Sequence, residues 1–308
     1  MSDSVSPIPY TGNKNCIQDT ILSVMPPHKT YLEACMGSAE IFLRKPRAEK
    51  EMINDYNGDL VKFFRVLQNS EKLSYLIGRL YLSFNSEQIF RENKQLLQMI
   101  PNTLDDIEHF VYTVEDYSWE DIKEVVAFFE NQVFSFSSTG KTIAIAKRDM
   151  TKKFTRLIAA CARLRDAIIL HRDFRDAIRY AVGEDTFVLL DPPYRGTEAC
   201  YQKSSFNGQT HQELFDFVYT VHKQYEGKCK FLITYNNDPV IRSLADACGF
   251  DTFVQPRLHN MQQGSDPGAI FEELLIANYD MKVQAEENER ALFHPVKQLT
   301  LFDFNPDY

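Results

Sequence analysis

The chain has 308 residues, of which 44% are hydrophobic and 25% are charged, and its formal net charge at pH 7 is −9. This composition is typical of a soluble globular protein with one large or two modest domains. No apolar run is long enough to span a membrane, the first residues lack a signal-peptide pattern, and the six cysteines form no Cys-x-x-Cys pair. We therefore expect a cytoplasmic protein without a membrane segment, a bound metal or disulfides.

The first part of the chain is predicted to form a strand, a helix and a second strand. Residues 30–35 (TYLEAC) are short and apolar and are followed by Gly37, which is typical of a strand that ends in a turn. Residues 51–57 have the pattern of a second strand that ends near Asp55, and residues 38–46 between them have a helical pattern. This order predicts a βαβ unit of a parallel sheet.

The rest of the chain is predicted to be an insertion followed by the remainder of the sheet. Residues 58–166 have mostly helical periodicity, interrupted by a polar, turn-rich stretch at 134–142. The strand pattern then resumes over 167–173, 186–194, 230–236, 251–258 and 272–280. We predict an α/β fold with a seven-stranded, mostly parallel, Rossmann-like sheet, one antiparallel strand, and a helical insertion after the second strand.

The turn after the first strand, EACMGSAEIF (33–42), has features of a ligand site. Gly37 allows the backbone to approach a ligand closely, and the helix that follows favours negative charge at its start. Glu33 and a single glycine do not form a G-x-G-x-x-G pattern, which disfavours a dinucleotide. Asp55, at the end of the second strand, is placed to accept hydrogen bonds from ribose hydroxyls. A cap on the following helix is the structural alternative for Asp55.

The stretch FVLLDPPYRG (187–196) runs from a buried strand directly into Asp-Pro-Pro-Tyr. Proline fixes φ and has no N–H to donate, so this tip is rigid and extended, at the end of a strand where α/β proteins bind ligands. The Asp191 carboxylate and the Pro192 carbonyl can accept hydrogen bonds from the amino group of a nucleobase. The Tyr194 ring can stack on that base, which is worth ~1–3 kcal/mol. A base held in this way must be flipped out of a duplex; a simple turn is the alternative reading.

Seven segments in this order resemble the Dam-type (D12 class) family of DNA adenine-N6 methyltransferases. They are PYTGNK (9–14), EACMGSAEIF (33–42), INDYNGDL (53–60), HRDFRDAI (171–178), VLLDPPY (188–194), LITYNND (232–238) and EELLIANYD (272–280). The resemblance covers nearly the whole chain. It implies an enzyme that transfers a methyl group from S-adenosylmethionine to N6 of a flipped adenine in double-stranded DNA.

The resemblance also implies a domain organisation and a set of site residues. The expected parts are a first catalytic part (1–65), a helical target-recognition insertion (66–160), a second catalytic part with the DPPY tip (161–282), and a linker and tail (283–308). The catalytic residues implied are Asp191, Pro192, Pro193 and Tyr194. The donor-binding residues implied are Tyr10, Lys14, Glu33, Gly37, Asp55, Asp173, Phe174 and Asp191.

Individual roles follow from the same resemblance. Lys14 suits the carboxylate of the donor, and Asp173 and Phe174 match the pair that meets the adenine ring of the donor, although Asp173 could also cap the helix that follows it. The chain departs from the family pattern after Glu33. Where the family prefers Glu-Pro-Phe and then Gly-x-Gly, this chain has Ala34, Cys35 and Ala39.

A basic stretch and the C-terminal tail suggest two macromolecular partners. We expect the basic residues to contact DNA phosphates, with a solvated surface as the alternative; they are Lys141, Lys147, Arg148, Lys152 and Lys153. The segment QLTLF (298–302) resembles the peptide by which bacterial proteins dock on the sliding clamp. Its contact residues would be Gln298, Leu299, Leu301 and Phe302, and a tail that folds back on its own domain is the alternative.

Two other functions stay open from the sequence. One is methylation of another exocyclic amine, such as cytosine N4 or adenine in RNA. The other is a catalytically silent DNA-binding regulator with the same fold. The recognition sequence, and whether a restriction enzyme accompanies the protein, are not readable from the residues.

Overall fold

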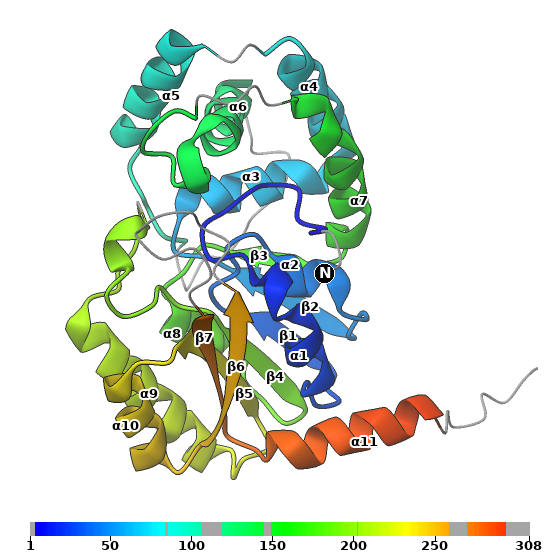
Figure 1. Ribbon diagram of the computed structural model, residues 1–308. Helices are drawn as coiled ribbons and strands as arrows, with labels where there is room; N and C mark the ends of the chain where they lie inside the picture. Colours follow the sequence, from blue (N-terminus) through cyan, green and yellow to red (C-terminus); the bar gives the residue numbers. More distant parts are fainter. Residues whose placement is uncertain are drawn as a thin grey trace, which may run out of the picture.

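The computed structural model of the chain is an α/β fold with helices on both faces of a central sheet (Figure 1). It describes residues 4–83, 86–105, 119–144, 149–201, 203–258 and 270–293. The predicted clamp-binding residues and two of the predicted DNA-binding residues lie outside the described ranges; they are Gln298, Leu299, Leu301 and Phe302, and Lys147 and Arg148. Among the described residues, no helix combines the length and the apolar character that a membrane span requires.

The sheet has seven strands in the order β3-β2-β1-β4-β5-β7-β6. The strands are β1 (Thr30–Glu33), β2 (Lys50–Asn54), β3 (Ile168–Leu170), β4 (Thr186–Leu190), β5 (Lys230–Asn236), β6 (Asp251–Leu258) and β7 (Ile270–Ala277). All neighbours from β3 to β5 pair in parallel, whereas β7 is antiparallel to both β5 and β6. The predicted seven-stranded sheet with one antiparallel strand is therefore confirmed.

Strand β4 shows why the sheet needs helices on both faces. Its residues are buried along the whole strand, and successive side chains point to opposite faces. Phe187 and Leu189 join one apolar core, with helices α1 (Gln18–Ser23) and α2 (Glu40–Arg44). Val188 and Leu190 join a second core, under the helices α8 (Phe174–Ala181), α9 (Gly208–Gln224) and α10 (Pro239–Cys248).

A group of helices stands between β2 and β3 in the chain and lies beyond the sheet, at the top of Figure 1. It consists of α3 (Gly58–Gln68), α4 (Ser70–Tyr81), α5 (Glu87–Met99), α6 (Trp119–Phe134) and α7 (Phe154–Leu164). The short 3₁₀ turn η1 (Lys14–Cys16) precedes this part of the chain, and η3 (Phe136–Ser138) and η4 (Met150–Lys153) lie between α6 and α7. Phe63 of α3 stacks on Phe129 of α6 with ring centroids 5.7 Å apart, and both belong to the same core as Phe187 of the sheet.

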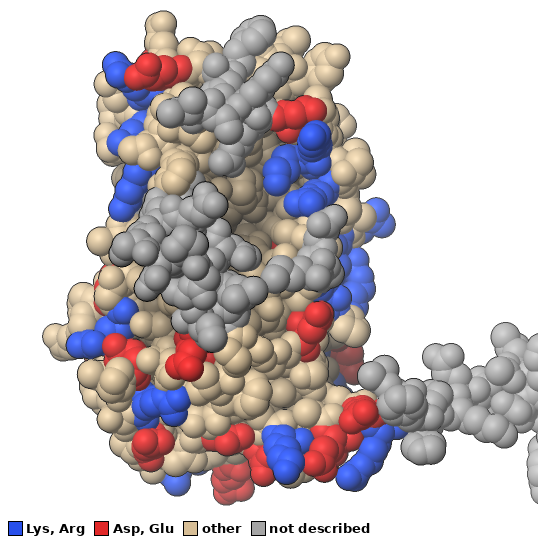
Figure 2. All heavy atoms as spheres, viewed as in Figure 1, with Lys and Arg blue, Asp and Glu red and all other residues tan. Residues whose placement is uncertain are grey.

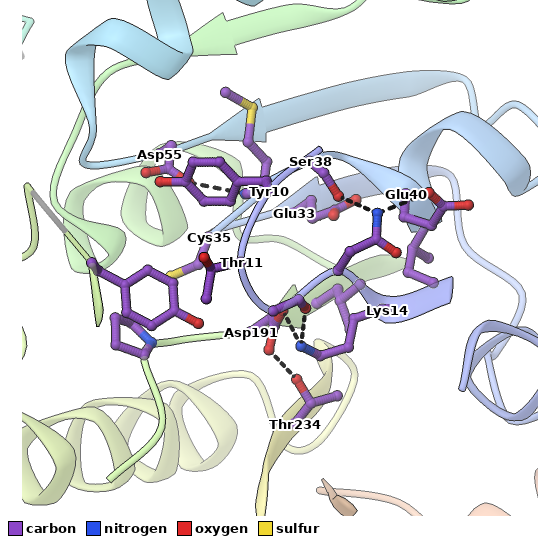
Figure 3. A pocket seen from close by; sticks show the side chains of 18 of the residues that line it. Tyr10, Thr11, Lys14, Glu33, Cys35, Ser38, Glu40, Asp55, Asp191 and Thr234 are labelled. Atoms are coloured by element: carbon purple, nitrogen blue, oxygen red, sulfur yellow. Dashed lines mark hydrogen bonds and ion pairs between the residues drawn. The ribbon is translucent and has the colours of Figure 1, made fainter. Parts of the chain in front are cut away.

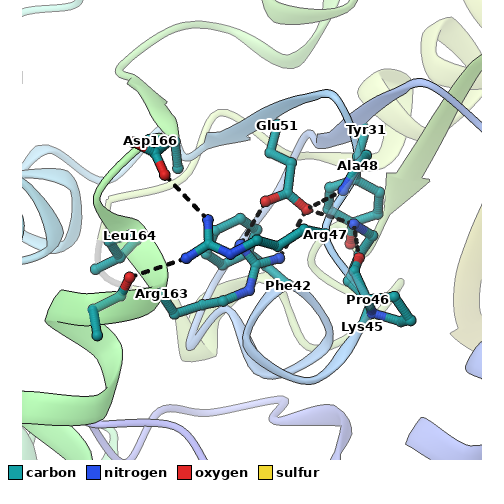
Figure 4. Close-up of polar contacts among 12 residues, drawn as sticks. Tyr31, Phe42, Lys45, Pro46, Arg47, Ala48, Glu51, Arg163, Leu164 and Asp166 are labelled. Carbon is teal, nitrogen blue, oxygen red and sulfur yellow. Dashed lines mark hydrogen bonds and ion pairs between the residues drawn. The ribbon is translucent and has the colours of Figure 1, made fainter. Parts of the chain in front are cut away.

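A buried ion cluster fastens α7 to the sheet (Figure 4). Glu51 of β2 accepts hydrogen bonds from Lys45 Nζ at 2.6 Å and from Arg163 Nη2 of α7 at 2.8 Å, and its side chain is 4% exposed. Burial by itself raises the pKa of Glu51, but the hydrogen bonds from Arg163 and Lys45 outweigh burial and lower that pKa to about 2. Glu51 is thus a fully ionised carboxylate that holds two cations at neutral pH.

The last of the described helices is α11 (Met281–Phe293), which extends from the lower edge of the molecule in Figure 1. Its first residue, Met281, is buried and donates its backbone N–H to Asp251 Oδ2 at 2.9 Å. Asn288 anchors the middle of the helix by donating to the carbonyl oxygens of Ser23 and Met25. The described part of the chain therefore ends on a helix that is tied to α1 and β6.

Candidate active site

A cleft opens at the carboxyl ends of β1 and β4, where the chain order reverses. From β1 the chain continues to β2 on one side, and from β4 to β5 on the other, which is the topological switch point at which open α/β sheets bind ligands. The cleft contains about 750 Å³ not filled by protein atoms, part of which is open to solvent. Six of the predicted donor-binding residues line it, namely Tyr10, Lys14, Glu33, Gly37, Asp55 and Asp191.

Asp55 and Gly37 form one end of the cleft. Asp55 accepts a hydrogen bond from the backbone N–H of Gly37 at 3.0 Å and another from that of Asn57 at 2.8 Å. Asn57, and not Asp55, caps α3. Burial raises the pKa of Asp55 to about 6, against the opposing effect of these N–H groups. Gly37 has φ +47°, in the left-handed region that glycine adopts without strain, and the Tyr10 ring lies within ordinary contact distance of this turn.

Glu33, the last residue of β1, lines the centre of the cleft. Its Oε2 accepts hydrogen bonds from the Tyr31 hydroxyl at 2.8 Å and from the backbone N–H of Phe42 at 2.9 Å. Burial dominates and raises the pKa of Glu33 to about 8. Glu33 is therefore mostly protonated at pH 7 and can act as a hydrogen-bond donor, whereas an ionised carboxylate could only accept.

The carboxylate of Asp191 is held from two sides (Figure 3). Lys14 Nζ lies 2.6 Å from Asp191 Oδ2 and also donates to the carbonyl oxygen of Gly12 at 2.6 Å. The hydroxyl of Thr234, on β5, donates to Asp191 Oδ1 at 2.6 Å. Burial raises the pKa of Asp191, while Lys14 and Thr234 oppose this rise by stabilising the ionised form. Lys14 is thus directed at Asp191, which was predicted to be catalytic, and sequence analysis did not identify Thr234.

The register of the strands explains why Thr234 reaches Asp191. Leu189 of β4 pairs with Leu232 of β5, and side chains two residues apart lie on the same face of a strand. Asp191 and Thr234 therefore emerge side by side on one face of the sheet. The signal in the sequence was a single threonine in the run KFLITYN, which does not reveal its partner.

The other residues of the DPPY tip are more deeply placed. Pro193 lines the cleft, whereas Pro192 and Tyr194 are buried and are not among the residues that line it. Tyr194 is 8% exposed, and its hydroxyl donates to the buried Glu273 of β7. Its ring lies 5.8 Å from that of Tyr235, centroid to centroid, and 4.9 Å from Lys14 Nζ. Strands β5 and β7 therefore support the tip from behind.

Asp173 and Phe174 lie outside the residues that line the cleft. Asp173 caps α8, accepting from the backbone N–H of Arg175 at 3.0 Å, and also pairs with the Arg175 guanidinium. Phe174 is 3% exposed and packs on Phe206, with ring centroids 5.5 Å apart. Phe206 itself lines the cleft. The aromatic side chain at the cleft is therefore Phe206, and the predicted Phe174 lies behind it.

The segment after DPPY, which includes η5 (Glu198–Cys200), folds over the cleft. A Cβ at Gly12 would lie 2.7 Å from the Tyr201 hydroxyl, so glycine is needed for this close approach. Lys203 forms an ion pair with Asp59 of α3 at 2.8 Å. Tyr201, Lys203 and Phe206 were missed because the segment carries no regular periodicity.

The turn that departs from the family pattern keeps an unusual backbone. Ala39 has φ 54°, in the left-handed region that glycine adopts without strain. Ala39 is fully buried and precedes α2. Cys35 lines the cleft, and burial raises the pKa of its thiol well above the ordinary value, which keeps it protonated. Ala39 therefore retains a glycine-like turn, and Cys35 gives this side of the cleft an uncharged surface.

The predicted DNA-binding lysines that the structure describes lie in two places. Lys141 is exposed, follows η3, and donates to the carbonyl oxygen of Ala199 beside the cleft. Lys152 and Lys153 lie in η4, next to α7, where Lys152 is exposed. Figure 2 shows Lys and Arg side chains over α5 and on the side of α4 and α7, with a hollow between these two regions. In the described part of the chain, no group of three or more His, Cys, Asp or Glu residues is arranged to hold a metal ion.

Comparison with known proteins identifies the family. Residues 10–253 match the family described as "D12 class N6 adenine-specific DNA methyltransferase". This range includes both ends of the cleft and the DPPY tip. None of the curated proteins matches the chain significantly. The family match covers most of the 308 residues and agrees with the mostly parallel seven-stranded sheet. The chain belongs to the D12 class N6 adenine-specific DNA methyltransferase family, and its activity is methylation of adenine N6 in DNA.

Proposed function

We propose that the cleft at β1 and β4 binds S-adenosylmethionine and a flipped adenine side by side. The observation that carries this proposal is Asp191, a partly buried carboxylate on a proline-stiffened tip, oriented between Lys14 and Thr234 at the switch point. When bound, S-adenosylmethionine supplies a methyl group activated by a sulfonium. The position of the cleft at the switch point, the backbone turn at Gly37 and the acid at Asp55 fit a nucleoside-bearing molecule.

Asp55, Gly37 and Tyr10 would hold the nucleoside part of the donor. Asp55, which already accepts two backbone N–H groups, has lone pairs left for ribose hydroxyls in its ionised form. The protonated Glu33 would donate a hydrogen bond across the centre of the cleft. Phe206 offers an apolar face for the adenine ring of the donor, with Phe174 and Asp173 acting behind it. Lys14 would lie near the methionyl end of the donor.

Asp191 would accept a hydrogen bond from the N6 amino group of the target adenine, with the Pro192 carbonyl as a second acceptor. The N6 lone pair is delocalised into the ring, so the free amine is a poor nucleophile. Acceptors on both hydrogens favour a more tetrahedral nitrogen, and the carboxylate stabilises positive charge as it develops there. Pro193 keeps the tip rigid, and the part of the Tyr194 ring that stays accessible would contact the base.

We propose that residues 66–160 form the target-recognition domain, between catalytic parts at 1–65 and 161–282. The limits at 65 and 160 fall within α3 and α7, so the domain shares these helices with the catalytic core. Lys141, Lys152 and Lys153 would contact DNA phosphates. We also propose localisation in the cytoplasm, which fits a DNA-modifying enzyme. Docking of QLTLF (298–302) on a bacterial sliding clamp is a further proposal, and it rests on the sequence of the tail alone.

Transfer of labelled methyl groups to double-stranded DNA tests the proposal. Wild-type protein with labelled S-adenosylmethionine should yield N6-methyladenine, and Asp191→Ala should lose at least 10²-fold in rate, roughly the value for removal of a charge-stabilising group. Label in cytosine N4 or only in RNA would favour another substrate, and no transfer by wild type would favour a silent regulator. Equal rates in both proteins would remove Asp191 from the mechanism.

A further inference from the structure

A second cavity adjoins the cleft on the side of the inserted helices. Tyr10, Thr11 and Tyr201 line both the cleft and this second cavity, so the two share a wall. The second cavity is also lined by Gln132 at the end of α6, by Ser138 of η3 and by Asn57. The Thr11 hydroxyl donates to the carbonyl oxygen of Ser138 at 3.3 Å. The catalytic part and the insertion therefore meet at this cavity.

Gln132 brings a buried and unpaired acceptor to this cavity. The side chain is 3% exposed, and its Oε1 has no hydrogen-bond partner among the residues that the structure describes. Two other buried amides with an unpaired oxygen, Asn131 and Asn236, do not line the cavity. A buried acceptor without a partner is unfavourable, because it has lost its water without replacement. A partner that enters the cavity with an N–H group would correct this.

The chemistry of the cavity selects a neutral partner. The described residues that line it contribute hydroxyl, phenol, amide and thiol groups, and none of them is Asp, Glu, Lys or Arg. A phosphate would find no opposite charge here, whereas a nucleobase is neutral and carries donors and acceptors on its edge. The second cavity borders the cleft through Tyr10 and Tyr201 and its free space is small, so the edge of a base next to the target adenine, and not a whole base, would reach into it.

We propose that Gln132 determines sequence specificity by accepting a hydrogen bond from the amino group of a base that flanks the target adenine. This inference rests on the proposed function of the cleft. In the major groove only adenine and cytosine present an amino donor, and the glutamine amide pairs with adenine in two places, accepting from N6 and donating to N7. Gln132 therefore favours adenine at that flanking position.

Methylation of a DNA library with randomised bases around a target adenine tests the inference, with the methylated sites read by sequencing. Wild-type protein should prefer one base at a flanking position, and Gln132→Leu should reduce that preference by roughly 5- to 150-fold, the usual range for a bidentate base contact. Gln132→Glu keeps an acceptor but loses the donor, so it should shift the preference toward cytosine. Gln224→Leu, an exposed glutamine at the end of α9, is the matched control and should leave the profile unchanged.

The outcomes separate this inference from the proposed function. No methylation by wild type would refute the function of the cleft itself. Methylation by wild type, Gln132→Glu and Gln132→Leu with the same base profile would refute the role of Gln132 alone and would mean that only water pairs with its Oε1. If Gln132→Leu does not fold, as judged by its melting curve, the nearly isosteric Gln132→Glu decides between the two results.

Discussion

Replacement of Thr234 by valine tests whether the hydrogen bond from β5 stabilises Asp191, the proposed catalytic carboxylate. Thr234 is fully buried, and valine has nearly the same shape, so Thr234→Val removes only the hydroxyl that donates to Asp191 at 2.6 Å. A hydrogen bond to an ionised group contributes about 1.5–3 kcal/mol. At a factor of ten for each 1.36 kcal/mol, kcat/KM should fall roughly 10- to 150-fold. Thr234→Ser keeps the hydroxyl and should stay within a few-fold of wild type.

The pH profile distinguishes this effect from a loss of packing. Thr234 lowers the pKa of Asp191, so its removal raises that pKa. Because the ionised carboxylate accepts the N6 hydrogen, activity on acidification should be lost at a higher pH in Thr234→Val than in wild type. The measurement is kcat/KM against pH with labelled donor, with melting curves to confirm folding. An unchanged acidic limb and an unchanged kcat/KM in Thr234→Val would refute the reasoning.

Three further outcomes are expected. Donor affinity, measured by calorimetry, should fall about tenfold per pH unit below the pKa of about 6 of Asp55, because protonation removes the ionised acceptor for the ribose. Asp55→Asn should bind the donor weakly and without this pH dependence. A donor affinity of the wild type that does not change with pH would contradict this role of Asp55. Glu51→Gln should lower the free energy of unfolding by about 3–5 kcal/mol by leaving two cations unpaired, while Glu184→Gln, in an exposed pair, should leave it nearly unchanged. The contribution of Glu51 to the free energy of unfolding is complete above its ordinary pKa of 4.5 and is lost as the pH falls toward about 2. Equal stability of the wild type and Glu51→Gln at pH 7 would therefore refute the stabilising role of Glu51. Lys152→Gln should flatten the slope of log DNA affinity against log salt by about 0.9 if the lysine contacts one phosphate, and an unchanged slope would exclude that contact.

The sequence was sufficient for the sheet because strand signals depend on local patterns. The apolar run before Asp191 and the single glycine at Gly37 predicted both the strand ends and the position of the cleft. Contacts between distant strands were not predictable in this way. Thr234 and Glu273 support the DPPY tip only because of the register of β5 and β7, which no local pattern encodes.

The differences between the predicted and the observed contacts at the site have the same physical origin, namely contacts with segments distant in the sequence. Phe174 follows a helix cap, and its amphipathic helix turns it into the core, so Phe206 from a segment without periodicity takes the place at the cleft. Tyr194 was expected at the surface of the tip, but the buried carboxylate of Glu273 draws its hydroxyl inward. Lys14, which the resemblance assigns to the donor carboxylate, also contacts Asp191, and its sequence neighbours do not reveal this contact.

The way in which the inserted helices join the sheet limits how the enzyme can engage a duplex. Only residues 55–57 separate β2 from α3, and only residues 165–167 separate α7 from β3. Both helices contribute to the apolar core that continues into the sheet, and Arg163 is fastened to Glu51. Such joints leave no flexible hinge for a rigid-body swing of the helical part. We therefore expect that local rearrangement of the short segments around Thr11, Ser138 and Tyr201 opens the path for the everted nucleotide that we propose.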